Sequence, residues 1–136
     1  MITGWILVAS VAQAETSISV DSISVDGLSV RALSCSLEKG GLLASAMVVG
    51  ALSSKKAALD ACAPGGAAFS ATWTWGAETV VASVSGSKPD ATDCVTAALK
   101  DIPSPVVGTC SALVLTGEPA AAAAAADAIQ AAPSTP

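Results

Sequence analysis

The sequence contains no histidine and no tyrosine, and only one phenylalanine and three tryptophans among its 136 residues. Without histidine, the Ser–His and Cys–His pairs that activate many protein nucleophiles are excluded. Two carboxylates, Asp90 and Asp93, lie close together, but at a helix start such residues usually cap the helix and complement its dipole. There is also no phosphate-binding loop and no G-x-S-x-G motif. We therefore expect a protein that is not an enzyme and that uses no cofactor.

Basic residues are scarce. The chain has six of them against eleven acidic residues, for a net charge of −5. They are scattered at Arg31, Lys39, Lys55, Lys56, Lys88 and Lys100. Nucleic-acid binding needs a basic surface that displaces counterions, so we expect no nucleic-acid partner.

Long apolar runs are missing as well, apart from a short one at the start. Ile6 to Val11 is apolar, and "AQA" precedes Glu15, as at a signal-peptidase site. The sequence therefore predicts a signal peptide over 1–14, with a buried first element or a misplaced start codon as alternatives. No later run reaches the ~20 residues of a membrane span. We expect an exported protein, periplasmic or extracellular, with no transmembrane segment in the mature chain.

Four cysteines are present, at Cys35, Cys62, Cys94 and Cys110, and no two of them form a C-x-x-C pair. Redox sites and zinc sites use short ligand spacings, which these cysteines lack. We therefore expect no metal site. In an exported chain, four cysteines indicate two structural disulfides.

Period-2 patterns predict the strands. "SISVD" occurs twice in tandem before Asp26-Gly27, which is typical of a hairpin turn. A five-residue repeat reverses side-chain parity, so we expect a short edge strand near 17–25 instead of one long flat strand, followed by a main strand near 28–37. "AAFSATWTWG" and "TVVASVSG" predict a second hairpin, with Val80, Ala82 and Val84 on one face. "GTCSALVLTG" at 108–117 predicts the last strand.

Two segments have helical periodicity. Residues 42–62 show apolar spacing close to one helical face, and "PGG" ends the segment. Gly50 and Ser53-Ser54 weaken the pattern, so a kink or a strand-like first half is the alternative. "DATDCVTAALKDIP" predicts a short amphipathic helix capped by Asp90 or Thr92. Residues 118–136 are low in complexity and rich in alanine and proline. We expect a disordered tail there and a single domain over 15–117.

This order, β-α-β-β-α-β after the edge strand, predicts an α+β fold in which a small antiparallel sheet carries two helices on one face, as in ferredoxin-like domains. The first and last strands are neighbours in such a sheet. Cys35 and Cys110 then meet at one end, and Cys62 and Cys94 meet at the other. Of the three possible connectivities, this topology selects Cys35–Cys110 and Cys62–Cys94.

Phe69, Trp73 and Trp75 share one face of the second hairpin. Aromatic residues on one strand face usually belong to the core. The alternative is a stripe that binds a ligand or partner, because Trp73 and Trp75 lie near the hairpin tip. Both interpretations are open at this point.

The segments "LLASAMVVGALSSKKAALDAC" and "CVTAALKDIPSPVVGTCSALVLTG" carry a family pattern. The pattern is a helix ending in cysteine, a hairpin, a Cys-Val-x-x-Ala-Leu helix, a proline-containing exit and a final strand. Over about 42–117 the chain resembles the AgmX/PglI-type C-terminal domain of deltaproteobacterial envelope proteins, which is TonB C-terminal-like. It differs by Ala63, where the family has an aromatic residue, and by the added Cys35 and Cys110.

The resemblance implies a TonB C-terminal-like sheet and a periplasmic interaction domain without catalytic residues. We therefore expect a non-enzymatic binding domain that contacts another envelope protein or envelope component. The alternative is a secreted inhibitor or effector held together by the same disulfides.

Overall fold

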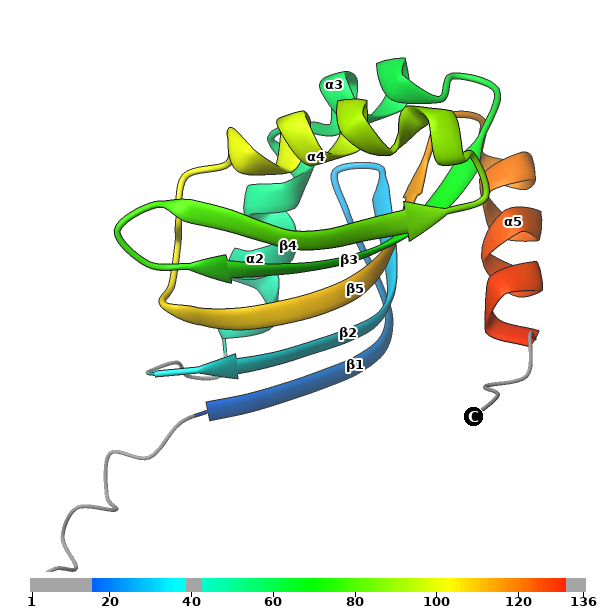
Figure 1. Ribbon diagram of the computed structural model, residues 1–136. Coiled ribbons are helices and arrows are strands. Elements are labelled where there is room, and N and C mark those ends of the chain that lie inside the picture. The colour runs from blue at the N-terminus through cyan, green and yellow to red at the C-terminus, as the bar shows by residue number, and fades with distance from the viewer. Residues whose placement is uncertain (1–15, 39–42, 132–136) are drawn as a thin grey trace, which may run out of the picture.

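The computed structural model describes residues 16–38 and 43–131 (Figure 1). In these ranges the chain forms a five-stranded antiparallel sheet, four α-helices and two disulfides. The strands are β1 Thr16–Val25, β2 Leu28–Leu37, β3 Ala67–Trp75, β4 Thr79–Gly86 and β5 Gly108–Thr116. The helices are α2 Ala44–Ser53, α3 Lys56–Cys62, α4 Thr92–Lys100 and α5 Pro119–Ala131, with a 3-10 turn at Pro89–Ala91.

The predicted α+β class is confirmed. The strand order is β1-β2-β5-β3-β4, so the main first strand and the last strand are neighbours, as expected. Cys35 and Cys110 face each other across β2 and β5, and both predicted disulfides are present. No helix in the described part of the chain is long and apolar enough to cross a membrane.

The segment with helical spacing over 42–62, for which a kink was one alternative, forms two helices, α2 and α3. The hydroxyls of Ser53 and Ser54 donate to the carbonyls of Gly50 and Ala51, at 2.8 and 2.6 Å. The amide of Lys55 bonds to the carbonyl of Leu52 at 3.0 Å, which closes a tight turn. Serine hydroxyls compete in this way for helix backbone groups, and the serine pair is where the helix ends.

The first hairpin shows how both copies of the tandem repeat fit into one strand. Its turn residues Asp26 and Gly27 have φ values of 51° and 86°, as a two-residue hairpin turn requires. β1, Thr16–Val25, is the edge strand expected near 17–25, and it continues through both copies of the repeat. The parity reversal occurs inside the strand, opposite Ala32, whose φ is 52°. Each copy of the repeat thereby directs its two apolar residues to the core, and these are Ile18, Val20, Ile23 and Val25.

This reversal bends the β1–β2 hairpin toward the helices (Figure 1). Gly27 at its tip lies against the aliphatic side chain of Lys56 on α3. One face of the sheet, which we call the inner face, packs against α2, α3 and α4 around the main core. In the described part of the chain, the opposite face, the outer face, is covered by a helix only at one end, where α5 packs on Ala68, Leu113 and Leu115.

A bulge in β4 corrects one sequence expectation. The register between β3 and β4 shifts between Thr72 and Trp73, so β4 contains one extra residue. As a result Val81 and Val84, not Val80, Ala82 and Val84, contact the core. Val80 is 55% exposed.

The C-terminal segment contains a second correction. Residues 118–131 are not a disordered tail, because α5 is a packed helix whose Ala122 and Ala126 are buried. The sequence alone does not show the sheet surface on which this helix packs. An alanine run buries little area, but small residues also permit close packing on a sheet. Residues 1–15 and 132–136 lie outside the described ranges, so the signal peptide over 1–14 stays a prediction.

Candidate functional site

The outer face carries hydroxyl side chains on all five strands. They form two rows that run across the sheet, each made of residues paired from strand to strand. The first row is Ser17, Ser36, Thr109 and Thr74, and the second is Ser19, Ser34, Ser111, Thr72 and Ser83. We call these nine residues the hydroxyl face.

Strand periodicity places these hydroxyls opposite the core. On β2 and β5 they alternate with Cys35 and Cys110, and on β3 with Trp73, all of which are buried. The alternation S-x-S, T-x-S or T-x-T around each buried residue was therefore visible in the sequence. The same pattern that marks the core on one side of each strand thus marks a row of hydroxyls on the other side, which the sequence-based predictions did not include.

No position in the two rows is charged or aromatic, so the hydroxyl face is polar but neutral. A hydroxyl donates one hydrogen bond and accepts others, which suits it to partners of either kind. The hydroxyls of Thr74 and Thr109 are 3.1 Å apart, which confirms that neighbouring strands present them on the same side. Because serine and threonine are short, the backbone lies close to the surface along these rows.

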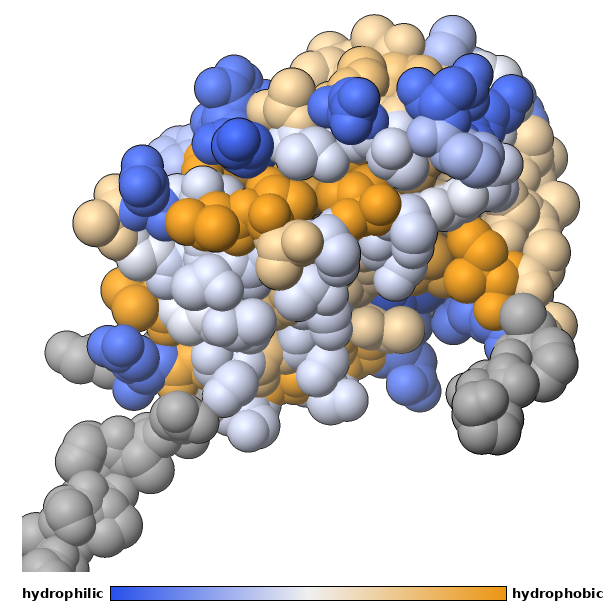
Figure 2. Space-filling model, viewed as in Figure 1, coloured by the Kyte–Doolittle hydropathy of each residue, from blue (hydrophilic) through white to orange (hydrophobic). Residues whose placement is uncertain are grey.

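A shallow hollow lies over the centre of this face. The residues that line it come from four strands, and they are Ser17, Ile18, Ser19, Ser34, Cys35, Ser36, Thr72, Thr109, Cys110 and Ser111. Figure 2 shows the corresponding region as a pale band below the helices, between the strongly coloured hydrophobic and charged residues. The hollow gives a partner a place of contact without a deep cleft.

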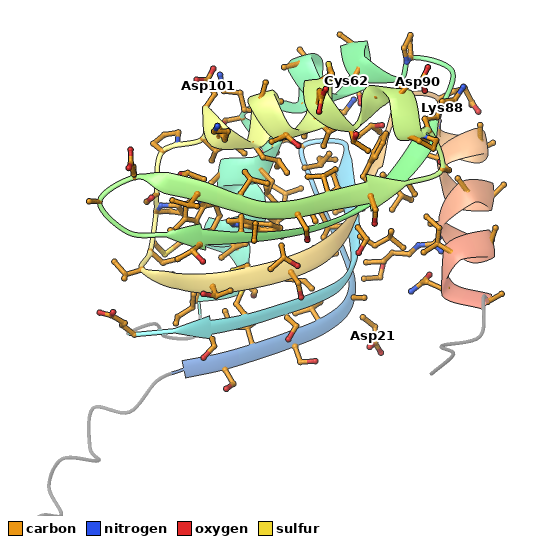
Figure 3. All side chains as sticks on the ribbon, in the orientation of Figure 1. Asp21, Cys62, Lys88, Asp90 and Asp101 are labelled. Atoms are coloured by element: carbon orange, nitrogen blue, oxygen red, sulfur yellow. A yellow bond between two sulfur atoms is a disulfide. The ribbon has the colours of Figure 1, made fainter. Side chains whose placement is uncertain are left out.

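The two disulfides have different surroundings. Cys35–Cys110 is buried directly beneath the hydroxyl face, and it joins the two strands at its centre. Cys62–Cys94 joins α3 to α4 in the helix layer, where Figure 3 shows Cys62. All four cysteines are in disulfides. Cys94 is therefore half of a structural cross-link and not a thiolate nucleophile or metal ligand.

The aromatic residues are not available for binding. Trp73 and Trp75 are each 1% exposed and Phe69 is 0% exposed. The two indole rings pack edge to face at 5.5 Å between centroids. The interpretation as core is therefore the correct one, and the alternative of a partner-binding stripe at Phe69, Trp73 and Trp75 is wrong for this structure, because inward strand parity buries all three.

The carboxylates near α4 are exposed, and Asp101 lines an open surface pocket with Glu78 and Lys100. Figure 3 places Lys88 and Asp90 at the start of α4 and Asp101 at its end. The predicted cap by Asp90 or Thr92 is absent: Ala91 occupies the N-cap position, and the Thr92 hydroxyl donates to the Pro89 carbonyl at 2.9 Å. Within 16–38 and 43–131, no three His, Cys, Asp or Glu residues are grouped to hold a metal ion.

Comparison with known proteins adds no relative. No family model, no curated protein and no solved structure matches this chain. A function for the chain therefore has to be argued from its own residues and geometry.

Proposed function

We propose that this chain is an exported, non-enzymatic binding domain of the cell envelope and that the hydroxyl face is its binding surface. The observation that carries the proposal is the combination of three properties in one surface. The hydroxyl face spans all five strands, it has no charged residue in either row, and no helix within the described ranges covers it.

The absence of charge is the informative property. A protein surface that meets only water usually carries many charged side chains of both signs. Charged residues are depleted at the centre of protein interfaces, and so is serine, so the lack of charge and not the serine content favours a contact area. Arg31 lies outside the two rows, paired with Leu113 at the end of the outer face that α5 covers. This arrangement favours an uncharged contact area over the two rows.

The chemistry of the face indicates a neutral polar partner. Hydroxyl rows offer many donors and acceptors but no aromatic platform and no basic cluster. They suit amide or hydroxyl groups on another envelope protein or component, and they offer nothing to hold a phosphate-rich polymer. The Cys35–Cys110 disulfide beneath the rows holds β2 and β5 together, so the surface is preorganised before a partner binds.

Two further features support export. Two disulfides in a small domain are typical of oxidising compartments. The predicted signal peptide over 1–14 and the resemblance to TonB C-terminal-like domains point the same way. Both would place the hydroxyl face where it meets other envelope components.

The test is an unbiased pull-down from the envelope fraction with the mature chain and two variants. Ser34→Lys puts a charge at the centre of the hydroxyl face, where Ser34 is exposed. Ala97→Lys is the matched control, because Ala97 is exposed on α4 in the helix layer. We expect the same partner with wild type and Ala97→Lys, and at least tenfold less of it with Ser34→Lys.

Equal recovery with Ser34→Lys would show that the hydroxyl face is not the binding surface. The location of the wild-type protein tests the other half of the proposal. Retention in the envelope fraction supports a binding domain of the envelope. Release of the folded chain into the medium would favour the secreted inhibitor or effector instead.

A further inference from the structure

A small pocket lies where the bent β1–β2 hairpin, α3 and the first turns of α5 meet. The hairpin contributes Ser22, Ser29 and Arg31 to its lining, and α3 contributes Lys56 and Asp60. Figure 1 shows the bent tip of the hairpin reaching the helix layer. None of these residues belongs to the hydroxyl face, so the pocket is a separate site, which we call the Arg31–Lys56 pocket.

The Arg31–Lys56 pocket concentrates positive charge in an acidic protein. The chain has only six basic residues and a net charge of −5, yet two basic side chains line this one pocket. The side chains of Arg31 and Lys56 are 24% and 36% exposed, so both are partly withdrawn from water. Asp60 is the one carboxylate among the described lining residues. Two cations and one carboxylate leave the lining with one uncompensated positive charge.

Arg31 keeps hydrogen-bond donors for a ligand. Its Nη1 makes both contacts with α5, to Asp127 at 2.6 Å and to Gln130 at 3.0 Å. Asp127 is not a lining residue and its side chain is 72% exposed, so water screens this ion pair strongly. The Nε and Nη2 groups of Arg31 have no hydrogen-bond partner in 16–38 and 43–131. This edge of a guanidinium matches the two oxygens of a carboxylate.

Lys56 is held at the pocket in a similar way. Its ammonium donates to the Asp60 carboxylate one turn further along α3, and its aliphatic chain lies against Gly27. The other oxygen of Asp60 accepts from the amide of Gly117 at 2.8 Å. Both oxygens of Asp60 are thus engaged, whereas the ammonium has three donors and uses one of them within the described ranges. Asp60 therefore positions Lys56 and leaves it able to bind a second acceptor.

The rest of the lining sets the size and polarity of a ligand. The pocket has a volume of about 190 Å³. That is room for about six water molecules at ~30 Å³ each, or for a carboxylate with a few carbon atoms. Leu115, Ala122 and Ala123 supply apolar wall, and the hydroxyls of Ser22 and Ser29 supply polar wall. The pocket therefore suits a small ligand that is anionic at one end and aliphatic at the other.

We propose that the Arg31–Lys56 pocket binds a carboxylate attached to a short aliphatic group, as in a peptide that ends in alanine or in a small free acid. Nε and Nη2 of Arg31 donate to the two oxygens, the Lys56 ammonium adds a charge-assisted hydrogen bond, and the apolar wall receives the aliphatic group. One carboxylate neutralises the one uncompensated charge. A phosphate group carries about −1.5 to −2 at pH 7, which exceeds it.

The test is a titration of the isotope-labelled chain, followed by nuclear magnetic resonance at the amides of Gly27 and Gly117, which both line the pocket. The probe is N-acetylalanine, which has a carboxylate beside a methyl group. N-acetylalaninamide is the uncharged control, and propionate and inorganic phosphate are compared at constant ionic strength. We expect both amides to shift with N-acetylalanine and to stay unchanged with N-acetylalaninamide.

Three variants address the pocket and one is a matched control. Arg31→Met and Lys56→Met each remove a charge and keep an aliphatic side chain, whereas Ala123→Leu fills the pocket without changing charge. Each should weaken binding by about tenfold or more, as loss of a charge-assisted hydrogen bond or of the space for the ligand requires. Lys55→Met is the control, because Lys55 is 30% exposed, pairs with Asp101 and does not line the pocket. It should keep the wild-type affinity within about twofold.

The two carboxylates distinguish the sources of the ligand. Equal affinity for propionate and N-acetylalanine would support the pocket and identify a small free acid, whereas tighter binding of N-acetylalanine would support it and identify a peptide terminus. Absence of shifts at Gly27 and Gly117 with both carboxylates would overturn the proposal, and so would binding of phosphate alone. An equal loss of affinity in Lys55→Met would also overturn it, because any charge change would then suffice. Ala123→Leu keeps both basic residues, so unchanged binding in this variant refutes the pocket even if a charge variant fails to fold.

Discussion

Cys35 on β2 and Cys110 on β5 lie directly opposite each other, with Cα atoms 4.1 Å apart. Both are buried under the hydroxyl face, and Trp73 is the partner of Cys110 on the next strand. The other disulfide has a different setting, since Cys94 is exposed and Cys62 is half-buried. One disulfide therefore lies inside the domain and one lies on its surface.

The two disulfides should be reduced in order. Thiol exchange needs access of the attacking thiolate to a sulfur atom, so Cys62–Cys94 should open first in mild dithiothreitol without denaturant. Alkylation followed by peptide mass mapping should find label on Cys62 and Cys94 while Cys35 and Cys110 remain paired. First appearance of label on Cys35 would contradict the burial seen in the structure.

Removal of the surface disulfide should lower stability and leave binding unchanged. It closes a separation of 32 residues, for which the loop-entropy argument gives about 3–4 kcal/mol of unfolding free energy. Cys62→Ala/Cys94→Ala should lose that amount in urea denaturation, and Cys94→Ser a similar amount, because the two residues act as one unit. Full stability of Cys94→Ser combined with loss of the partner would instead identify a functional thiol.

Trp73 should matter through its volume and not through a hydrogen bond. Its indole nitrogen is buried and has no hydrogen-bond partner among the described residues. Trp73→Ala should cost about 3–5 kcal/mol of unfolding free energy. Trp73→Phe should cost less than half as much, because it keeps an aromatic ring and breaks no hydrogen bond. Val80→Ala on the exposed side of β4 is the control, with a change within about 0.5 kcal/mol; an equal effect at Val80 would place the core on the wrong side of the hairpin.

Gly117 should be irreplaceable, although it lies outside any strand or helix. Its φ is +77°, and an added Cβ would clash with the Ala63 carbonyl oxygen. Gly117→Ala should therefore lose more than about 1 kcal/mol in thermal or urea denaturation. Gly76→Ala is the matched control, since no described atom beyond its chain neighbours lies within 4 Å of its added Cβ. Equal stability of both variants would mean that the junction before α5 is looser than in this structure.

The mature chain should begin at Glu15. Cleavage after the predicted signal peptide gives this N-terminus, which Edman sequencing or intact mass of the exported protein would measure. Recovery of a chain that retains Met1 in the envelope would mean that the first apolar segment serves as an anchor.

Local patterns predicted the strands well because each strand has one buried side. The alternation Cys35-x-Leu37 on β2 and Phe69-x-Ala71-x-Trp73 on β3 directly reflects burial of every second residue. The residues between the buried positions are mainly serine and threonine, so the hydroxyl face was present in the same alternation although it was not predicted. The Asp26-Gly27 turn was equally visible, because its φ values need those residue types.

The alternation of buried and exposed residues predicted the wrong side-chain directions where one irregular residue exchanges the inward and outward positions of a strand. The bulge in β4 turns Val80 outward and Val81 inward, and the bend opposite Ala32 lets β1 continue through both copies of its repeat. Such irregularities depend on how neighbouring strands pair, and a strand read alone does not contain that information.

The sequence by itself determined the α+β class, the order of elements and the pairing of the cysteines, because these follow from periodicity and from short connections between neighbouring elements. Tertiary structure alone decided that Phe69, Trp73 and Trp75 belong to the core and that α5 packs on Leu113 and Leu115. An alanine helix has nearly the same face in every direction, so its sequence does not specify a buried side. The shape of the sheet beneath it specifies that side, because only small side chains let a helix approach the strands this closely.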